Sequence, residues 1–169
     1  MENFRELTDT LPLGDDCDDV IAPSLSRADT IAPHLPCVRR YARGLSGSFG
    51  VGDRYVAKTL QKLIEEPTTE FTHINPKVAL FQTFMQVWDE PDIELVGDLP
   101  KSECDQAIVS MTMEPRQAFL LTAVEGFSSS QTGEILGKSE IAVSGLLERA
   151  SQQLSWKLAQ DCNDVLEPI

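Results

Sequence analysis

The stretch from Met113 to Leu154, MEPRQAFLLTAVEGFSSSQTGEILGKSEIAVSGLLERASQQL, decides the fold of this chain. Its helical runs are separated by a break at Gly126 and a turn at Gly137, and Ser128 and Ser139 stand where helix caps are expected. This layout predicts a helix-turn-helix. Apolar residues recur every three or four positions in its last helix, at Val143, Leu146, Leu147, Ala150, Leu154 and Leu158.

The last helix lacks the chemistry that reads DNA. Such a helix needs cations for phosphates and hydrogen-bonding groups for base edges. Arg149 is the only basic residue between Ser139 and Lys157. Because the shape of a DNA-binding motif remains without these groups, we expect no specific DNA binding. The positions where they would stand hold Glu140, Ser144, Gly145, Leu146, Glu148 and Ser151.

The charge of the whole chain points the same way. The 169 residues carry a net charge of -13, with an isoelectric point near 4.4. Residues 1–25 have a net charge of -6, residues 26–90 of +1, and residues 91–169 of -8. The helix-turn-helix part is therefore strongly acidic, and duplex DNA would be repelled overall.

Upstream, three further helical patterns precede a break in composition. Pro33 and Pro36 kink or restart the first, over 25–45. The second is expected to begin at an Asp53 cap, and the third spans 75–90 with Pro76 in its first turn. Its aromatic residues, at Phe81, Phe84 and Trp88, are expected to be buried.

These patterns predict an all-α protein with two small helical modules. Two prolines and a glycine in the linker predict that the modules can adopt more than one relative arrangement. The expected parts are an acidic arm over 1–25, a first module over 26–90, a linker over 91–102, a second module over 103–160 and a tail over 161–169.

Nothing in the sequence indicates catalysis, a cofactor or a metal. The two histidines, His34 and His73, are isolated, and the glycine-rich GSFGVGD lacks the lysine and strand of a phosphate loop. No apolar run approaches the roughly 20 residues that span a bilayer, and the N-terminus is acidic. We therefore expect a cytoplasmic protein that is not an enzyme. Free thiols are expected at Cys17, Cys37, Cys104 and Cys162.

One basic cluster, Arg39, Arg40 and Arg43, has two interpretations. It can bind nucleic acid, or it can pair with the chain's own acids or with an acidic partner. We favour the second, because a few cations beside an acidic module release few counterions from DNA.

Three stretches carry a resemblance to a known family: SRADTIAPHLPCVRRYARGLSGS (26–48), GDRYVAKTLQKLIEE (52–66) and residues 115–154. Together they resemble the sigma-like domain of the PhyR family of response regulators in the alphaproteobacterial general stress response. That domain is similar to regions 2 and 4 of sigma factors of the extracytoplasmic-function (ECF) class. The resemblance therefore implies a region 2-like module followed by a region 4-like helix-turn-helix.

The chain departs from both families. Where sigma factors typically have Lys or Arg in the last helix, it has Ser144, Leu146 and Ser151. The third-helix positions that face promoter DNA in sigma factors are occupied here by Gln82, Thr83 and Gln86. PhyR proteins continue into a receiver domain, whereas this sequence stops at QDCNDVLEPI. A fragment with its receiver removed and a stand-alone sigma-like protein both fit.

The resemblance implies an anti-anti-sigma factor. Such a protein mimics a sigma factor, binds a NepR-like anti-sigma factor and so releases the genuine EcfG-type sigma factor. One alternative is a genuine ECF sigma factor that binds promoter DNA and RNA polymerase, and another is a regulator that holds a partner without switching. Leu146 is expected to face solvent. The candidate partner-binding residues are Leu120, Val124, Leu146 and Leu147.

Overall fold

The computed structural model describes residues 27–65, 75–90 and 102–164, and within them all regular structure is helical. This confirms the all-α class. The arm, most of the linker, the end of the tail and His73 lie outside the described residues. The elements are α1 (Arg27–Ile31), the 3-10 helix η1 (Ala32–His34), α2 (Leu35–Ser46), α3 (Phe49–Glu65), α4 (Pro76–Trp88), α5 (Glu103–Ser110), α6 (Met113–Phe119), the π-helix η2 (Leu120–Val124), α7 (Ser129–Leu136) and α8 (Glu140–Asp164).

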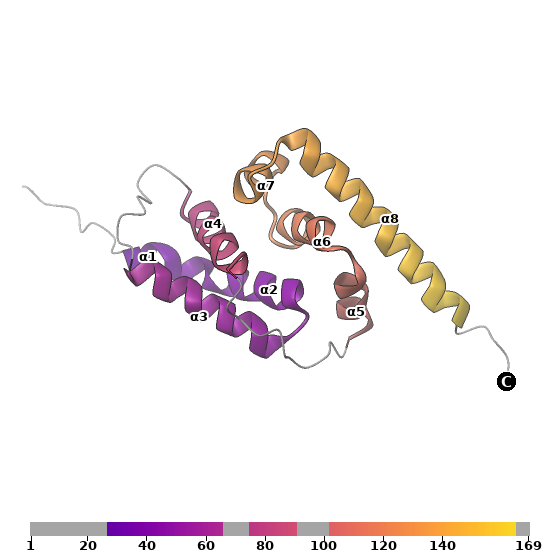
Figure 1. The fold of residues 1–169 in the computed structure, drawn as a ribbon, viewed down its shortest axis with the longest axis horizontal. Helices are drawn as coiled ribbons and strands as arrows, with labels where there is room; N and C mark the ends of the chain where they lie inside the picture. The colour runs from indigo at the N-terminus through magenta and orange to yellow at the C-terminus, as the bar shows by residue number, and fades with distance from the viewer. Residues whose placement is uncertain (1–26, 66–74, 91–101, 165–169) are drawn as a thin grey trace, which may run out of the picture.

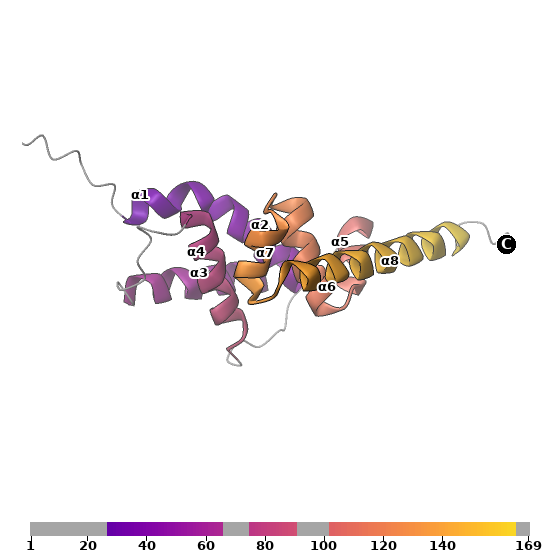
Figure 2. The same ribbon diagram turned by 90° about the horizontal axis from the view of Figure 1, so that it is seen from above.

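Figure 1 shows α1–α4 gathered at one end of the molecule and α5–α8 at the other. We call these the N-terminal and C-terminal halves. Helix α8 packs on α5, α6 and α7 and then runs out beyond them, as the turned view in Figure 2 also shows. No described helix is long and apolar enough to cross a membrane.

Proline divides the first helical pattern as the sequence predicts. Pro33 stands in the first turn of η1 and Pro36 in the first turn of α2. A proline has no backbone N–H to donate, so it is tolerated at the start of a helix and not inside one. The restart at Pro36 is confirmed, and it gives three short segments.

The predicted cap of the second helix is wrong. Helix α3 begins at Phe49, four residues before Asp53. The Ser48 hydroxyl accepts a hydrogen bond from the Val51 backbone N–H at 3.4 Å. Gly52 packs so closely on α2 that a Cβ there would lie 2.8 Å from the Arg43 backbone nitrogen. This close approach of α2 and α3 keeps the glycine-rich segment helical, and Asp53 lies inside α3.

The predicted caps and turns of the helix-turn-helix are confirmed. Ser128 accepts from the Gln131 N–H, and the Gln131 side chain accepts from the Ser128 N–H, which forms a capping box at α7. Gly126 and Gly137 have φ of 75° and 64°, in the left-handed region that favours glycine. The Ser139 hydroxyl accepts from Ala142 at the start of α8.

The two halves share one core. Tyr41 and Phe81 lie against each other with ring centroids 5.3 Å apart, and both side chains are fully buried. Phe81 also meets Phe127 of the C-terminal half edge-on at 4.9 Å. The predicted burial of Phe81 and Phe84 is confirmed, while Trp88 is partly buried. Burial of this apolar surface therefore holds the halves together as well as folding each one.

Candidate functional site: a groove between the two halves

A groove of about 1030 Å³ separates α2 from α5 and η2. Apolar side chains of both halves line it, with Leu120 buried against Gly44 and with Phe49 68% exposed at the rim. Exposed apolar surface inside a concave site is typical of binding sites. The lining residues include Leu35, Pro36, Gly44, Phe49, Ile108, Val109, Leu120 and Val124.

The α2 wall of the groove carries the basic cluster. Arg43 donates two hydrogen bonds to the Asp53 carboxylate, at 3.0 and 2.7 Å, and its guanidinium lies 5.0 Å from the centre of the Phe49 ring. Arg39 approaches the same carboxylate at 3.4 Å. Hydrogen bonding by Arg43 lowers the pKa of the Asp53 carboxyl. The predicted pairing of these arginines with the chain's own acids is therefore confirmed.

Arg40 pairs across the two halves. Its Nε and Nη2 donate to the two carboxylate oxygens of Glu125 at 2.8 and 2.7 Å. The Glu125 carboxylate is fully buried, whereas the Arg40 side chain is 57% exposed. Lys77 of α4 donates to the Glu125 backbone carbonyl and lies 4.3 Å from the centre of the Phe127 ring. One segment at the end of η2 is thus held by two cations of the N-terminal half.

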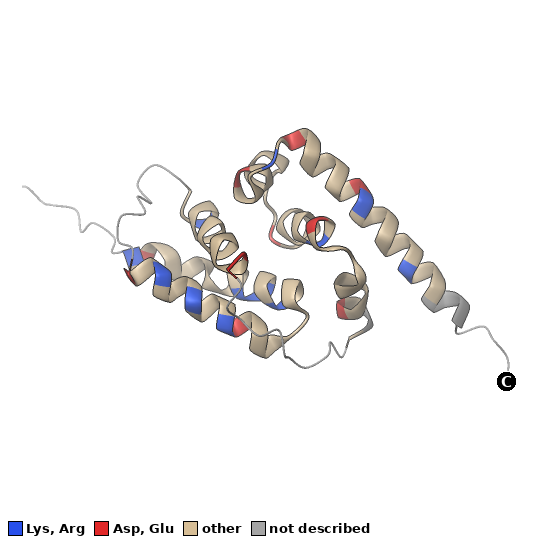
Figure 3. Ribbon diagram, in the orientation of Figure 1, with Lys and Arg blue, Asp and Glu red and all other residues tan. Residues whose placement is uncertain are grey.

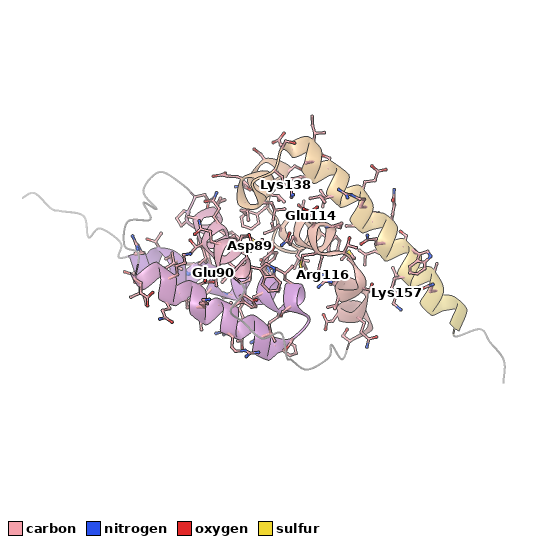
Figure 4. All side chains as sticks on the ribbon, in the orientation of Figure 1. Asp89, Glu90, Glu114, Arg116, Lys138 and Lys157 are labelled. Carbon is pink, nitrogen blue, oxygen red and sulfur yellow. The ribbon has the colours of Figure 1, made fainter. Side chains whose placement is uncertain are left out.

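Arg116 of α6 makes a second connection. It donates to the backbone carbonyls of Leu45 at 2.9 Å and Met111 at 2.6 Å, and also to that of Val109. The first carbonyl ends α2 and the others end α5, so one guanidinium joins three helices. Figure 4 labels Arg116 near the middle of the molecule. Burial lowers the pKa of Arg116.

The four candidate partner-binding residues separate into two places. Leu120 and Val124 line the groove, with Leu120 buried and Val124 36% exposed. Leu147 is half-buried on α8, and Leu146 is only 1% exposed. The prediction that Leu146 faces solvent is wrong, because α8 packs this side of itself on α6 and α7. A charge at Leu146 would therefore disturb the fold before it could test binding.

The third helix also differs from its predicted exposure. Thr83, taken as a promoter-facing position, is buried and donates to the Ala79 carbonyl. Gln82 donates to the Glu134 carbonyl of α7 at 3.2 Å, which adds a contact between the halves. Gln86 alone of the three is exposed.

The surface that a DNA-reading helix would present is poor in free cations. Glu140, Ser144, Glu148 and Ser151 are exposed on α8, and Figure 3 shows few charged positions along this helix. Lys138, at the turn before α8, pairs with Glu114 at 2.9 Å, and this hydrogen bond lowers the pKa of Glu114. Within the described part of the chain, no group of three His, Cys, Asp or Glu residues could hold a metal ion.

Sequence reasoning missed the main contacts between the halves. Arg40 and Glu125 are 85 residues apart, and Arg116 and Leu45 are 71 apart. No spacing rule links residues this distant. Phe49 is not among the candidate residues from the sequence, because it stands in the glycine-rich GSFGVGD stretch and the second helix is expected to begin only at Asp53.

Two family models match the chain: the sigma2 domain of PhyR over residues 31–85, and the sigma-like domain of the response regulator PhyR over residues 108–156. The chain belongs to the PhyR sigma-like family. A curated relative, the phyllosphere-induced regulator PhyR of Methylorubrum extorquens, is 37% identical over 142 residues. The match covers 81% of this chain and 52% of the relative, so the chain spans about half the length of that PhyR.

Solved structures share the fold. In the PhyRSL–NepR complex from Sphingomonas sp. Fr1, the match has a TM-score of 0.67 at 28% identity and covers 85% of this chain and 93% of that one. The sigma factor RpoE of Bartonella quintana, solved with the anti-sigma factor NepR, gives 0.63 at 21% identity and covers 76% and 94%. The fold of this PhyR-family chain is therefore also that of a sigma factor.

Proposed function

We propose that the chain is an anti-anti-sigma factor that mimics a sigma factor and binds a NepR-like anti-sigma factor. One observation carries this proposal: the fold of a sigma factor is retained, while the exposed positions of α8 hold mainly acids and serines, with Arg149 as the one cation between Ser139 and Lys157. Binding would release an EcfG-type sigma factor to join RNA polymerase. The chain would act in the cytoplasm and by binding alone, without catalysis.

Several features support a protein partner at the groove. It is apolar, open and formed by both halves, so a helical segment of the partner can bury its apolar face there. We propose that residues 26–90 and 103–160 are two modules and that the partner contacts both. Val124 would contact the partner in the arrangement described, Leu120 would form the buried floor of the groove beneath that contact, and Leu147 would extend the contact along α8. Leu146 would take part only if α8 moved away from α6 and α7.

Val124 offers a sharp test of the groove. Replacing it with Glu is expected to weaken the complex with a NepR-like protein by about 2 kcal/mol, roughly thirtyfold in Kd, because desolvating the carboxylate in the interface costs more than a pair with Arg40, which Glu125 already holds, returns. Isothermal titration calorimetry gives the affinity, and circular dichroism checks folding. The matched control is Ile141→Glu, at an apolar residue that is 86% exposed and does not line the groove. Equal affinities for the two variants would remove Val124 from the interface, and no complex with the unaltered chain would refute the proposed function.

The alternative of a genuine sigma factor is tested with DNA. Fluorescence anisotropy with promoter duplexes at low salt should show at most weak association that disappears as salt is added, because non-specific contacts depend on phosphate charge. A sequence-dependent complex with a Kd near 10⁻⁸ M at physiological salt is typical of specific recognition. Such a complex would overturn the mimic in favour of the sigma factor.

A further inference from the structure

We propose that the chain's own acidic segment, residues 1–26, docks in the groove between the halves and competes with the partner for it. This inference rests on the proposed function for the consequence of the competition, which is weaker binding of the NepR-like partner. The contact itself would be intramolecular and can be measured without a partner.

The arginines on the α2 wall of the groove can bind a further carboxylate. The side chains of Arg39 and Arg40 are each 57% exposed, and that of Arg43 is 33% exposed. Arg39 has, among the described residues, a single ion pair, the 3.4 Å approach of Nε to a carboxylate that Arg43 already holds with two hydrogen bonds. Its terminal nitrogens are therefore available to a further carboxylate, and a guanidinium can bind one in a bidentate way.

Residues 1–25 have the complementary composition. They hold seven acids and one base, and four of the acids lie in the run GDDCDDV at Gly14–Val20. Apolar residues flank that run, with Leu11 and Leu13 before it and Val20 and Ile21 at its end. An acidic centre between apolar flanks matches a groove that has three arginines, Arg39, Arg40 and Arg43, beside apolar lining residues, against one acidic lining residue, Asp105 of α5.

The segment is joined to α1, and this connection places it beside the groove. Ala32, Leu35 and Pro36, which line the groove, follow directly after α1, to which the segment is joined. Arg39 lies 12 residues beyond Arg27, across α1, η1 and the first turn of α2, a path of at most about 20 Å at rises of 1.5 Å per residue in an α-helix and 2.0 Å in a 3-10 helix. The eight residues from Asp19 to Arg27 can span up to about 28 Å when extended. The acidic run can therefore reach the arginines without moving a helix.

Docking of this kind would weaken partner binding in proportion to its occupancy. If the segment fills the groove in nine of ten molecules, the apparent Kd rises about tenfold. The chain's own segment is favoured over a second copy because it is covalently attached, which gives it a high effective concentration at the groove.

The test compares two variants of the full chain that lose the same charge. The first neutralises the run with Asp15→Asn, Asp16→Asn, Asp18→Asn and Asp19→Asn. The control neutralises four exposed acids elsewhere with Glu65→Gln, Glu134→Gln, Glu140→Gln and Glu148→Gln. In two-dimensional amide NMR spectra without partner, the first variant should shift the signals of Arg39, Arg40, Gly44 and Val124. The control should leave those signals in place.

A spin label on Cys17 locates the segment directly. With Cys37→Ala, Cys104→Ser and Cys162→Ser, the label should broaden the groove signals and spare those of Lys138–Ile141, which do not line the groove. Mixing spin-labelled chain with isotope-labelled chain that has no spin label separates an intramolecular contact from one between copies. Groove signals broadened as strongly in the mixture as in the fully spin-labelled sample would overturn the proposal in favour of a second copy, and groove signals unmoved by both experiments would overturn it outright.

The affinity for a NepR-like protein then tests the competition. The Asn variant should bind about tenfold more tightly than the unaltered chain, and the Gln control should bind no more tightly. Unchanged affinity in the Asn variant would overturn the competition. If no chain binds the partner, the proposed function fails, whereas the NMR result still decides whether the segment docks.

Discussion

Replacing Arg116 with Met is expected to lower the free energy of unfolding by about 3 kcal/mol, because hydrogen bonds from a charged donor contribute roughly 1.5–3 kcal/mol each and are not additive. Met keeps much of the side chain's length and apolar stem but donates nothing. The carbonyls of Leu45, Val109 and Met111 would then lose the guanidinium that joins α2, α5 and α6. Urea unfolding followed by circular dichroism measures the loss.

The control for this substitution is Arg149→Met. Arg149 is exposed on α8, and its Nε donates to the Gly145 carbonyl at 3.3 Å within the same helix. A surface change of this kind is expected to alter stability by no more than about 0.5 kcal/mol. Arg116→Lys should recover only part of the loss, since an ammonium lacks the planar fork of a guanidinium. A stability of Arg116→Met equal to that of Arg149→Met would show that Arg116 does not connect the helices.

Replacing Arg40 with Ala should cost about 3 kcal/mol, at the low end of the range for breaking a buried ion pair. The reason is asymmetric burial. The Glu125 carboxylate is fully buried and would be left without its cation, while the Arg40 side chain is 57% exposed. Glu125→Gln should cost less than Arg40→Ala, because the freed guanidinium can be hydrated.

Arg39→Ala is the matched control, since its side chain has the same 57% exposure and stands next in sequence. It should change stability by less than about 1 kcal/mol, as expected for an exposed pair. Urea unfolding of Arg40→Ala, Glu125→Gln and the double variant completes a cycle that isolates the pair. A coupling energy near zero would show that the pair does not hold the halves together.

The sequence correctly predicted several local caps, turns and helix breaks. The Ser128 capping box, the left-handed Gly126 and Gly137 and the restart at Pro36 all follow from hydrogen bonds and dihedral angles within a few residues. The stripe of Phe81 and Phe84 was readable for the same reason, because helical spacing fixes which residues share a face. The missing cations of α8, and the family resemblance with them, also came from the sequence.

The sequence predicted only part of the candidate site. Leu120 and Val124 were named and do line the groove, yet Leu146 was expected on the surface and is buried. Periodicity marks an apolar face and does not say what covers it. On α8 the covering elements are α6 and α7, and on η2 one side faces the core while Val124 remains exposed at the groove.

What the sequence by itself determined was the all-α class, the caps and turns of the helix-turn-helix and the loss of DNA-reading chemistry, since each depends on residues close together in the chain. The tertiary structure alone decided that α3 starts at Phe49, that Glu125 pairs with Arg40 and that Arg116 joins three helices. The physical reason is distance along the chain. These contacts form only after burial of the shared core brings together segments that are as far as 85 residues apart in the sequence. No local sequence preference specifies such a long-range contact.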